Sequence, residues 1–155
     1  MSDGVEQART MVVELDHDLL IVVHTKEPPT DEEWDEYVSL SVKQVNEGGF
    51  GHRRMSRQLV LTDGGAPSLG QRKRATDAYK QAAAGEPLQT AIAIVSDSAY
   101  SRFVTTALSI VVKGIRSFSG AELDHALVYL GVADVAGARR RVERLRARLQ
   151  GEGKR

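Results

Sequence analysis

The sequence predicts an α/β protein with one mixed sheet, followed by an arginine-rich C-terminal helix. Short apolar segments alternate with longer amphipathic ones over most of the 155 residues, the pattern of parallel strands joined by helical crossovers. The first two apolar segments are separated only by residues 16–18, which predicts an antiparallel hairpin. After residue 132, apolar positions recur every three or four residues among arginines, which predicts a helix with a narrow apolar seam.

Residues that begin or end strands and helices define the predicted elements of the N-terminal part. We expect the hairpin strands at Met11–Leu15 and Leu19–His24, with two prolines ending the second strand. Thr30 and Glu33 have the spacing of a capping box and open an amphipathic helix that closes near residues 48–49. Residues 1–10 are predicted to be a flexible N-terminus.

The central elements alternate strictly between strand and helix. Gln58–Thr62 and Thr90–Val95 are continuous apolar runs, as expected for strands covered on both faces. Between them, Ser68 and Gln71 form a second capping box for a basic helix over Leu69–Ala84.

The last part of the predicted domain, which covers residues 11–131, repeats the alternation. A third helix starts at Asp97 or Ser98 and runs to about residue 113, and Ile115–Phe118 is the final strand. A third capping box at residues 119–122 opens a helix that ends at residue 130. Residues 132–155 form a separate basic helix and tail.

Composition excludes several classes of protein. The chain has no cysteine, which excludes disulfides, thiolate metal sites and cysteine nucleophiles. Its 21 basic and 21 acidic side chains give zero net charge, which argues against a generic nucleic-acid binder. No apolar run reaches the roughly 18 residues of a membrane span, and the first ten residues are too polar for a signal peptide. We therefore expect a cytoplasmic protein.

The zero net charge conceals an uneven distribution. Residues 1–47 contain 12 acidic and 3 basic side chains, whereas residues 139–155 contain 2 acidic and 8 basic ones. Such segregation predicts docking between oppositely charged surfaces, within the chain or between chains. The candidate receptor for the tail arginines is the acidic start of the first helix, at Asp31, Glu32, Glu33, Asp35 and Glu36.

Two loops are candidates for a ligand site. Ligands of open α/β sheets bind beyond the carboxyl ends of parallel strands, where this chain has Asp63 and Asp97, with Ser68 and Ser98 at the following helix starts. If the two strands are neighbours, this rim and its helix N-termini are suited to a small molecule, nucleotide or other anion. The alternative is structural, because Asp and Ser are ordinary helix caps and Gly64-Gly65 is an ordinary turn.

Recognisable catalytic signatures are missing from the sequence. Residues 64–70 match neither a P-loop nor a dinucleotide-binding fingerprint. The four histidines do not have metal-ligand spacing, and no nucleophile elbow is present. We therefore predict a non-enzymatic protein without a cofactor or metal.

Basic residues and the tail are candidates for partner binding. Arg72 and Arg74 lie on the second predicted helix, either as an ordinary solvated face or as contacts for an acidic partner. The apolar seam of the tail packs either on its own domain or against a second copy, as a homo-oligomer interface. The seam consists of Val135, Ala138, Val142, Leu145 and Leu149.

The order of elements, with QLVLTDGG, TAIAIVSDSA and IRSFSGAELDHALVYLG at their expected places, resembles small bacterial proteins of STAS-like fold. These are relatives of the anti-sigma-factor antagonists, with a weaker likeness to lipid-binding SEC-fourteen-type domains. The resemblance covers roughly residues 11–131. It implies a regulatory module that binds proteins, and it makes Ser68 a candidate phosphorylation site, although the family's adjacent Asp-Ser pair is absent because four residues separate Asp63 from Ser68.

The expected function is therefore protein binding through the loop and helix at residues 63–74. Its candidate residues are Asp63, Gly64, Gly65, Ser68, Arg72 and Arg74, with Asp97 and Ser98 on the neighbouring loop. The alternatives are a small-molecule or anion site at the Asp63/Asp97 rim and a structural oligomer formed through the tail.

Overall fold

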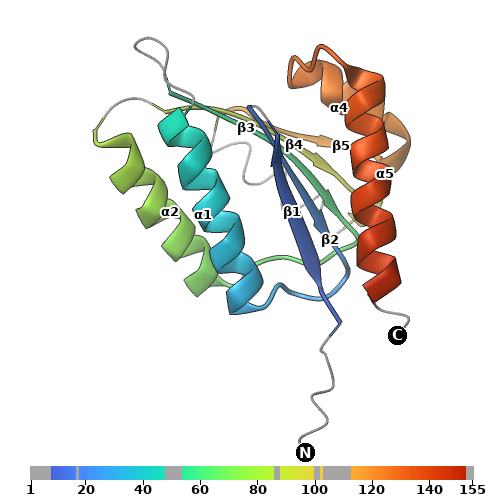
Figure 1. Cartoon of the computed structure of the whole chain (residues 1–155), viewed down its shortest axis with the longest axis horizontal. Helices are drawn as coiled ribbons and strands as arrows, with labels where there is room; N and C mark the ends of the chain where they lie inside the picture. Colours follow the sequence, from blue (N-terminus) through green and yellow to red (C-terminus); the bar gives the residue numbers. More distant parts are fainter. Residues whose placement is uncertain are drawn as a thin grey trace, which may run out of the picture.

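A five-stranded sheet lies between two layers of helices (Figure 1). The computed structural model describes residues 8–16, 18–47, 54–85, 88–99, 102 and 113–152. The strands are β1 (Met11–Asp16), β2 (Leu19–His24), β3 (Arg54–Thr62), β4 (Leu88–Val95) and β5 (Ile115–Phe118). The helices are α1 (Asp31–Glu47), α2 (Leu69–Ala83), the 3-10 turn η1 (Gly120–Glu122), α4 (Leu123–Tyr129) and α5 (Val135–Glu152).

The strands are ordered in space as they are in sequence, from β1 to β5. The β1–β2 pair is antiparallel, and the three following pairs are parallel. The predicted class, an α/β fold in which a hairpin leads into parallel strands, is confirmed. The carboxyl ends of β2, β3 and β4 consequently lie along one edge of the sheet.

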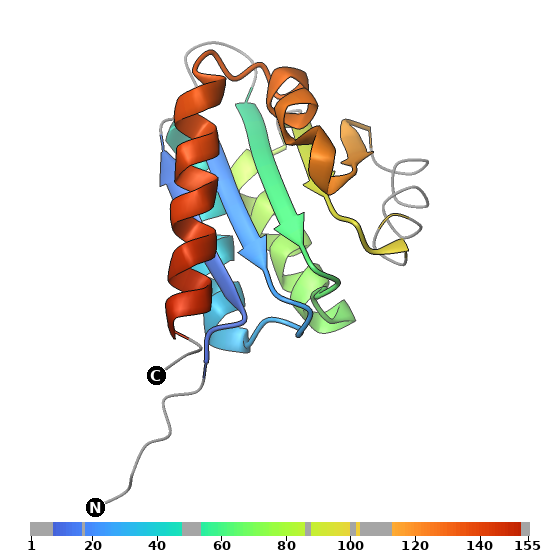
Figure 2. The same cartoon turned by 90° about the vertical axis from the view of Figure 1, so that its right-hand side faces the viewer.

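Both faces of the central strands are buried, which explains their continuous apolar sequences. On one face, Leu20 and Val22 of β2 pack in one cluster with Trp34 and Tyr37 of α1. On the other face, β2 contributes alternate residues to a second cluster that includes side chains of α4 and α5. Figure 2 shows α5 lying along this second face.

Strand β3 begins earlier than the sequence predicted, because its parallel pairing with β4 continues back to Arg54 opposite Leu88. The polar side chains that concealed this extension have partners inside the protein. Ser56 Oγ accepts from the Gln58 amide at 3.1 Å and donates to Gln44 Oε1 at 3.4 Å. Arg57 forms an ion pair with Asp18 at 2.9 Å.

Most of the third predicted helix, at residues 98–113, lies outside the described residues, as does the predicted end of the first helix at residues 48–49. The capping box of Ser119 and Glu122 is present. It opens η1 rather than a regular helix, and α4 follows directly. The expected single helix up to residue 130 is therefore a 3-10 turn and an α-helix in succession.

The apolar seam of α5 packs on its own domain. Val142, Leu145 and Leu149 are 0%, 2% and 8% exposed and belong to the cluster on the α4/α5 face. Ala138 is buried in the same cluster, and Val135 is partly buried against it. The intramolecular alternative is therefore realised, and the seam is not open to a second copy while α5 stays in place.

The arginines of α5 do pair with acidic residues, but not with those predicted. Arg141 contacts Glu14 at 3.1 Å and Asp16 at 2.8 Å, both on β1, and Arg144 contacts Glu14 at 3.2 Å. Within one chain, the prediction that α1 receives these arginines is wrong, because α1 and α5 lie on opposite faces of the sheet.

None of the helices in the described part of the chain is both long and apolar enough to cross a bilayer.

Candidate functional site

The loops after β3 and β4 lie side by side, as the neighbouring positions of these strands require. Leu61 pairs with Val95 near the ends of the two strands. A Cβ atom built on Gly64 would lie 3.9 Å from Ser98 Oγ. The predicted proximity of the two loops is therefore present in the structure.

The two predicted rim carboxylates have different surroundings. The Asp97 side chain accepts a hydrogen bond of 2.8 Å from the Gly120 backbone N–H at the start of η1. Asp63 is exposed and lines a pocket of about 700 Å³ with residues of β2 and α5, and Asp97 is not part of that lining. Asp97 therefore has the structural role of a cap, and a site at this edge would involve Asp63 without it.

Gly65 joins the loop after β3 to the loop after β2. Its N–H donates to Thr25 O at 3.0 Å, and its carbonyl accepts from Thr62 Oγ1 at 2.8 Å. A Cβ atom at Gly65 would lie only 2.3 Å from Glu27 O and 2.5 Å from Thr25 O. Only glycine allows this approach of two backbones, so Gly65 holds the loop in position.

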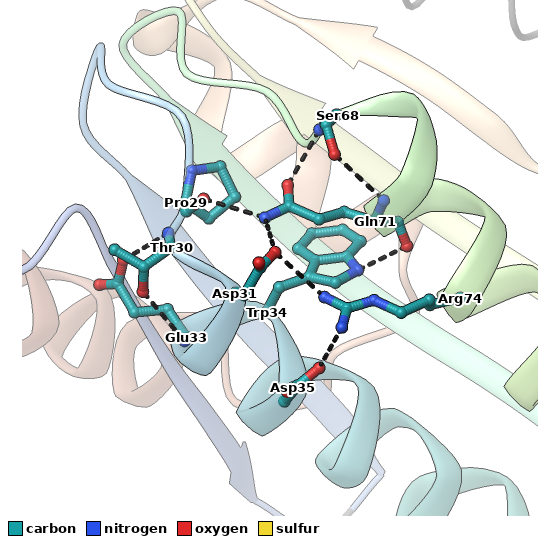
Figure 3. A network of polar contacts seen from close by, with 9 residues as sticks. All are labelled: Pro29, Thr30, Asp31, Glu33, Trp34, Asp35, Ser68, Gln71 and Arg74. Carbon is teal, nitrogen blue, oxygen red and sulfur yellow. Dashed lines mark hydrogen bonds and ion pairs between the residues drawn. The ribbon is translucent and has the colours of Figure 1, made fainter.

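The start of α2 is fastened to the start of α1 through Gln71 (Figure 3). The predicted capping box is confirmed: Gln71 N donates to Ser68 Oγ at 3.1 Å, and Ser68 N donates to Gln71 Oε1 at 2.9 Å. The Gln71 amide also donates to Pro29 O at 3.0 Å and to Asp31 Oδ1 at 3.1 Å. The Trp34 indole N–H donates to Gln71 O at 2.6 Å. These contacts bury Gln71 and fix the orientation of the first turn of α2.

Some basic residues of α2 form ion pairs within the chain, and Arg72 does not take part in these ion pairs. Arg74 bridges to α1, with contacts to Asp31 at 3.2 Å and Asp35 at 3.3 Å (Figure 3). Lys73 pairs with Asp77 at 2.8 Å on its own helix. Arg72 is exposed and donates through Nε to Pro67 O at 3.3 Å. Arg72 is therefore better suited than Arg74 to meet a partner.

Leu69 is the residue at this end of the molecule that sequence reasoning missed. It is 78% exposed at the first position of α2, directly after the exposed cap Ser68. In the structure, the buried positions Gln71, Ala75 and Ala83 define a face of α2 that does not include position 69. Leu69 is thus an exposed apolar side chain among the exposed polar residues Ser68, Arg72 and Lys73.

Two buried titratable residues, Glu33 and His24, lie near the same edge of the sheet. The Glu33 carboxylate accepts from the backbone N–H groups of Thr10 and Met11, both at 2.9 Å, and from Thr30 N at 3.0 Å. Burial opposes ionisation of Glu33, but these bonds and one from the Thr10 hydroxyl outweigh it and lower its pKa. His24 is 6% exposed, and burial lowers its pKa from 6.5 to about 4 despite the nearby charge of Glu33. His24 is thus neutral at physiological pH.

Among the described residues, no three His, Asp or Glu side chains gather in a group that could hold a metal ion. The chain matches none of the protein-family models, curated proteins or solved structures with which it was compared.

Proposed function

We propose that the protein is a non-enzymatic binding module that recognises another protein through the start of α2. We call this region the docking surface and define it as the exposed residues of the segment 63–73. They are Asp63, Ala66, Ser68, Leu69, Gly70, Arg72 and Lys73. The observation that carries the proposal is the 78% exposure of Leu69 at the centre of this segment.

The docking surface has the composition of a small binding hot spot. Burying an exposed leucine in a partner's recess contributes about 1.5–3 kcal/mol, and arginine is among the residues that most often dominate interfaces. The fitting partner therefore has an apolar recess for Leu69 with a carboxylate beside it for Arg72. Gln71 and Trp34 already hold the first turn of α2 in place. Binding a partner therefore costs little conformational entropy there.

The regulatory role remains part of this proposal. The hairpin followed by parallel strands supports the resemblance to STAS-like bacterial proteins at the level of fold class, and fold class alone does not specify function. The proposed setting is the bacterial cytoplasm. In that setting Ser68 is the proposed phosphorylation site, because it is exposed and adjoins Leu69.

Two substitutions of Ser68 are expected to distinguish its role as a helix cap, which affects stability, from the effect of a negative charge on partner binding. Ser68→Ala removes the acceptor for Gln71 N and should cost about 1 kcal/mol of stability, while aspartate keeps the cap. Ser68→Asp should therefore leave stability unchanged and weaken partner binding by placing a negative charge beside Leu69. Thermal unfolding and partner capture measure the two effects. If Ser68→Asp captures the partner as well as the wild type does, phosphorylation of Ser68 does not regulate binding.

The proposal is tested by quantitative affinity capture from cells of the source organism, comparing variants of equal stability. Leu69→Glu and Arg72→Glu should each reduce recovery of the same partner about tenfold or more, which corresponds to ~1.4 kcal/mol. Val128→Glu is the matched control, because Val128 is 67% exposed on α4, away from the docking surface. Equal recovery by Leu69→Glu and Val128→Glu would refute the proposal. Arg74→Glu is unsuitable, because it breaks the contacts with Asp31 and Asp35.

A further inference from the structure

The pocket lined by Asp63 lies at the carboxyl ends of β2 and β3, on the α5 side of the sheet. We call it the strand-end pocket. Its walls come from the N-terminal arm at residues 8–10, the end of β2 with residues 25–27, the end of β3, and the last turns of α5. Figures 1 and 2 both place the C-terminal end of α5 beside the start of β1. Its volume of about 700 Å³ is in the usual range for small-molecule sites, and open α/β sheets bind ligands at this edge.

Buried hydrogen bonds hold the walls of the strand-end pocket in place. The N-terminal arm is fastened on one side by Glu33, which accepts from Thr10 N and Met11 N. On the other side, Thr25 N donates to Thr10 O at 2.9 Å. The wall at the end of β3 is held by the contacts of Gly65 with Thr25 and Thr62. The cavity is thus formed before any ligand arrives, which lowers the entropic cost of binding.

The floor of the pocket is apolar and its rim carries charged side chains of both signs. Val23, Leu61 and Leu149 line it and are each less than a tenth exposed. The charged side chains of the remaining lining are Arg9, Lys26, Arg146, Glu27 and Asp63, and they stand with the buried His24 and several neutral residues.

Two of these cations are available to a ligand. Arg9 already pairs with Glu36 at 3.0 Å. Lys26 and Arg146 are exposed on separate elements, and neither forms an ion pair with any described residue. Cations above an apolar floor match a molecule that has an acidic group attached to an apolar body.

We propose that the strand-end pocket binds a small amphipathic organic anion, with its acidic group between Lys26 and Arg146 and its apolar part on Val23, Leu61 and Leu149. This site is separate from the docking surface, apart from Asp63 at their common border. It does not depend on the proposed protein partner.

Two dyes of nearly identical skeleton test the proposal on the full-length protein. They are 8-anilinonaphthalene-1-sulfonate, which is anionic, and N-phenyl-1-naphthylamine, which lacks the sulfonate. Fluorescence titration should show saturable binding of one anionic dye per chain and at least tenfold weaker binding of the neutral dye. Equal affinity for the two dyes, or no saturable binding of the anionic dye, would overturn the proposal.

Charge reversals locate the site. Arg146→Glu and Lys26→Glu should each weaken binding of the anionic dye about tenfold or more, because each replaces a cationic hydrogen-bond donor with a negative charge that repels the sulfonate. Arg140→Glu is the matched control on α5, since Arg140 is exposed and does not line the pocket. All three variants should keep a cooperative thermal transition, which excludes dye binding to a loosened core. A loss of affinity in Arg140→Glu equal to that in Arg146→Glu would contradict the assignment.

Discussion

Replacing Leu145 with alanine is expected to lower the free energy of unfolding by about 2–5 kcal/mol, the range for truncating a buried leucine in a well-packed core. Leu145 is 2% exposed and packs in the cluster that joins α5 to the sheet. Leu69→Ala is the matched control, since the same truncation at a side chain 78% exposed should change stability by less than about 0.5 kcal/mol. Urea unfolding of both variants measures the difference.

The same experiment separates the two arrangements of the C-terminal helix. If α5 packs on its own chain, Leu145→Ala lowers stability at every protein concentration. If the seam instead joined two copies, the variant would dissociate, and the mass measured by light scattering would fall. Deletion of residues 139–155 is a poorer test, because it removes Val142, Leu145 and Leu149 from the core and should unfold the domain.

Acidification from pH 6.5 to pH 4 is expected to destabilise the protein by about 3 kcal/mol through His24, since each unit of pKa shift corresponds to ~1.36 kcal/mol. Burial lowers the pKa of His24 from 6.5 to about 4, so the unfolded chain binds a proton in this interval that the folded chain does not. The stability contributed by neutral His24 is therefore complete above pH 6.5 and decreases as the pH falls towards 4.

His24→Gln, which has no titrating group at this position, should show a much flatter dependence of unfolding free energy on pH between 6.5 and 4.5. His125→Gln is the matched control, since the His125 side chain is 76% exposed. Below pH 4.5, protonation of Glu33, whose pKa is lowered in the folded protein, destabilises wild type and variants alike. A wild-type slope in His24→Gln would show that His24 does not determine the acid response.

Local signals in the sequence were sufficient for most of the fold. All three capping boxes form, because each needs only two side chains at fixed spacing next to a helix start. The strands β2 and β5 have the predicted bounds, His24 and Phe118 included. The capping boxes depend on interactions within a few residues, and the bounds of these two strands follow from local apolar runs and end signals, all of which one sequence contains.

Features that depend on pairing across the fold were not predictable in the same way. Charge counts predicted docking between acidic and basic surfaces, but the arrangement of the strands and helices determines the partners. Arg141 pairs with Glu14 and Asp16 of β1, whereas Arg74 pairs with Asp31 of α1. The start of β3 was missed because partners distant in sequence, Gln44 and Asp18, satisfy the polar side chains of Ser56 and Arg57. At the candidate site, the cap at Ser68 was predicted, whereas the separate surroundings of Asp63 and Asp97 depend on where η1 and α5 lie.

The most direct test of the docking surface is a photo-crosslinking amino acid, p-benzoylphenylalanine, placed at position 69 and, separately, at position 128 in the full-length protein in cells. Both positions are exposed, so each variant should fold and expose its crosslinker equally to solvent. We expect position 69 to give one discrete adduct that Arg72→Glu abolishes, and position 128 to give none of that species. The same adduct from both positions, or none from position 69 at native expression, would contradict a docking surface centred on Leu69.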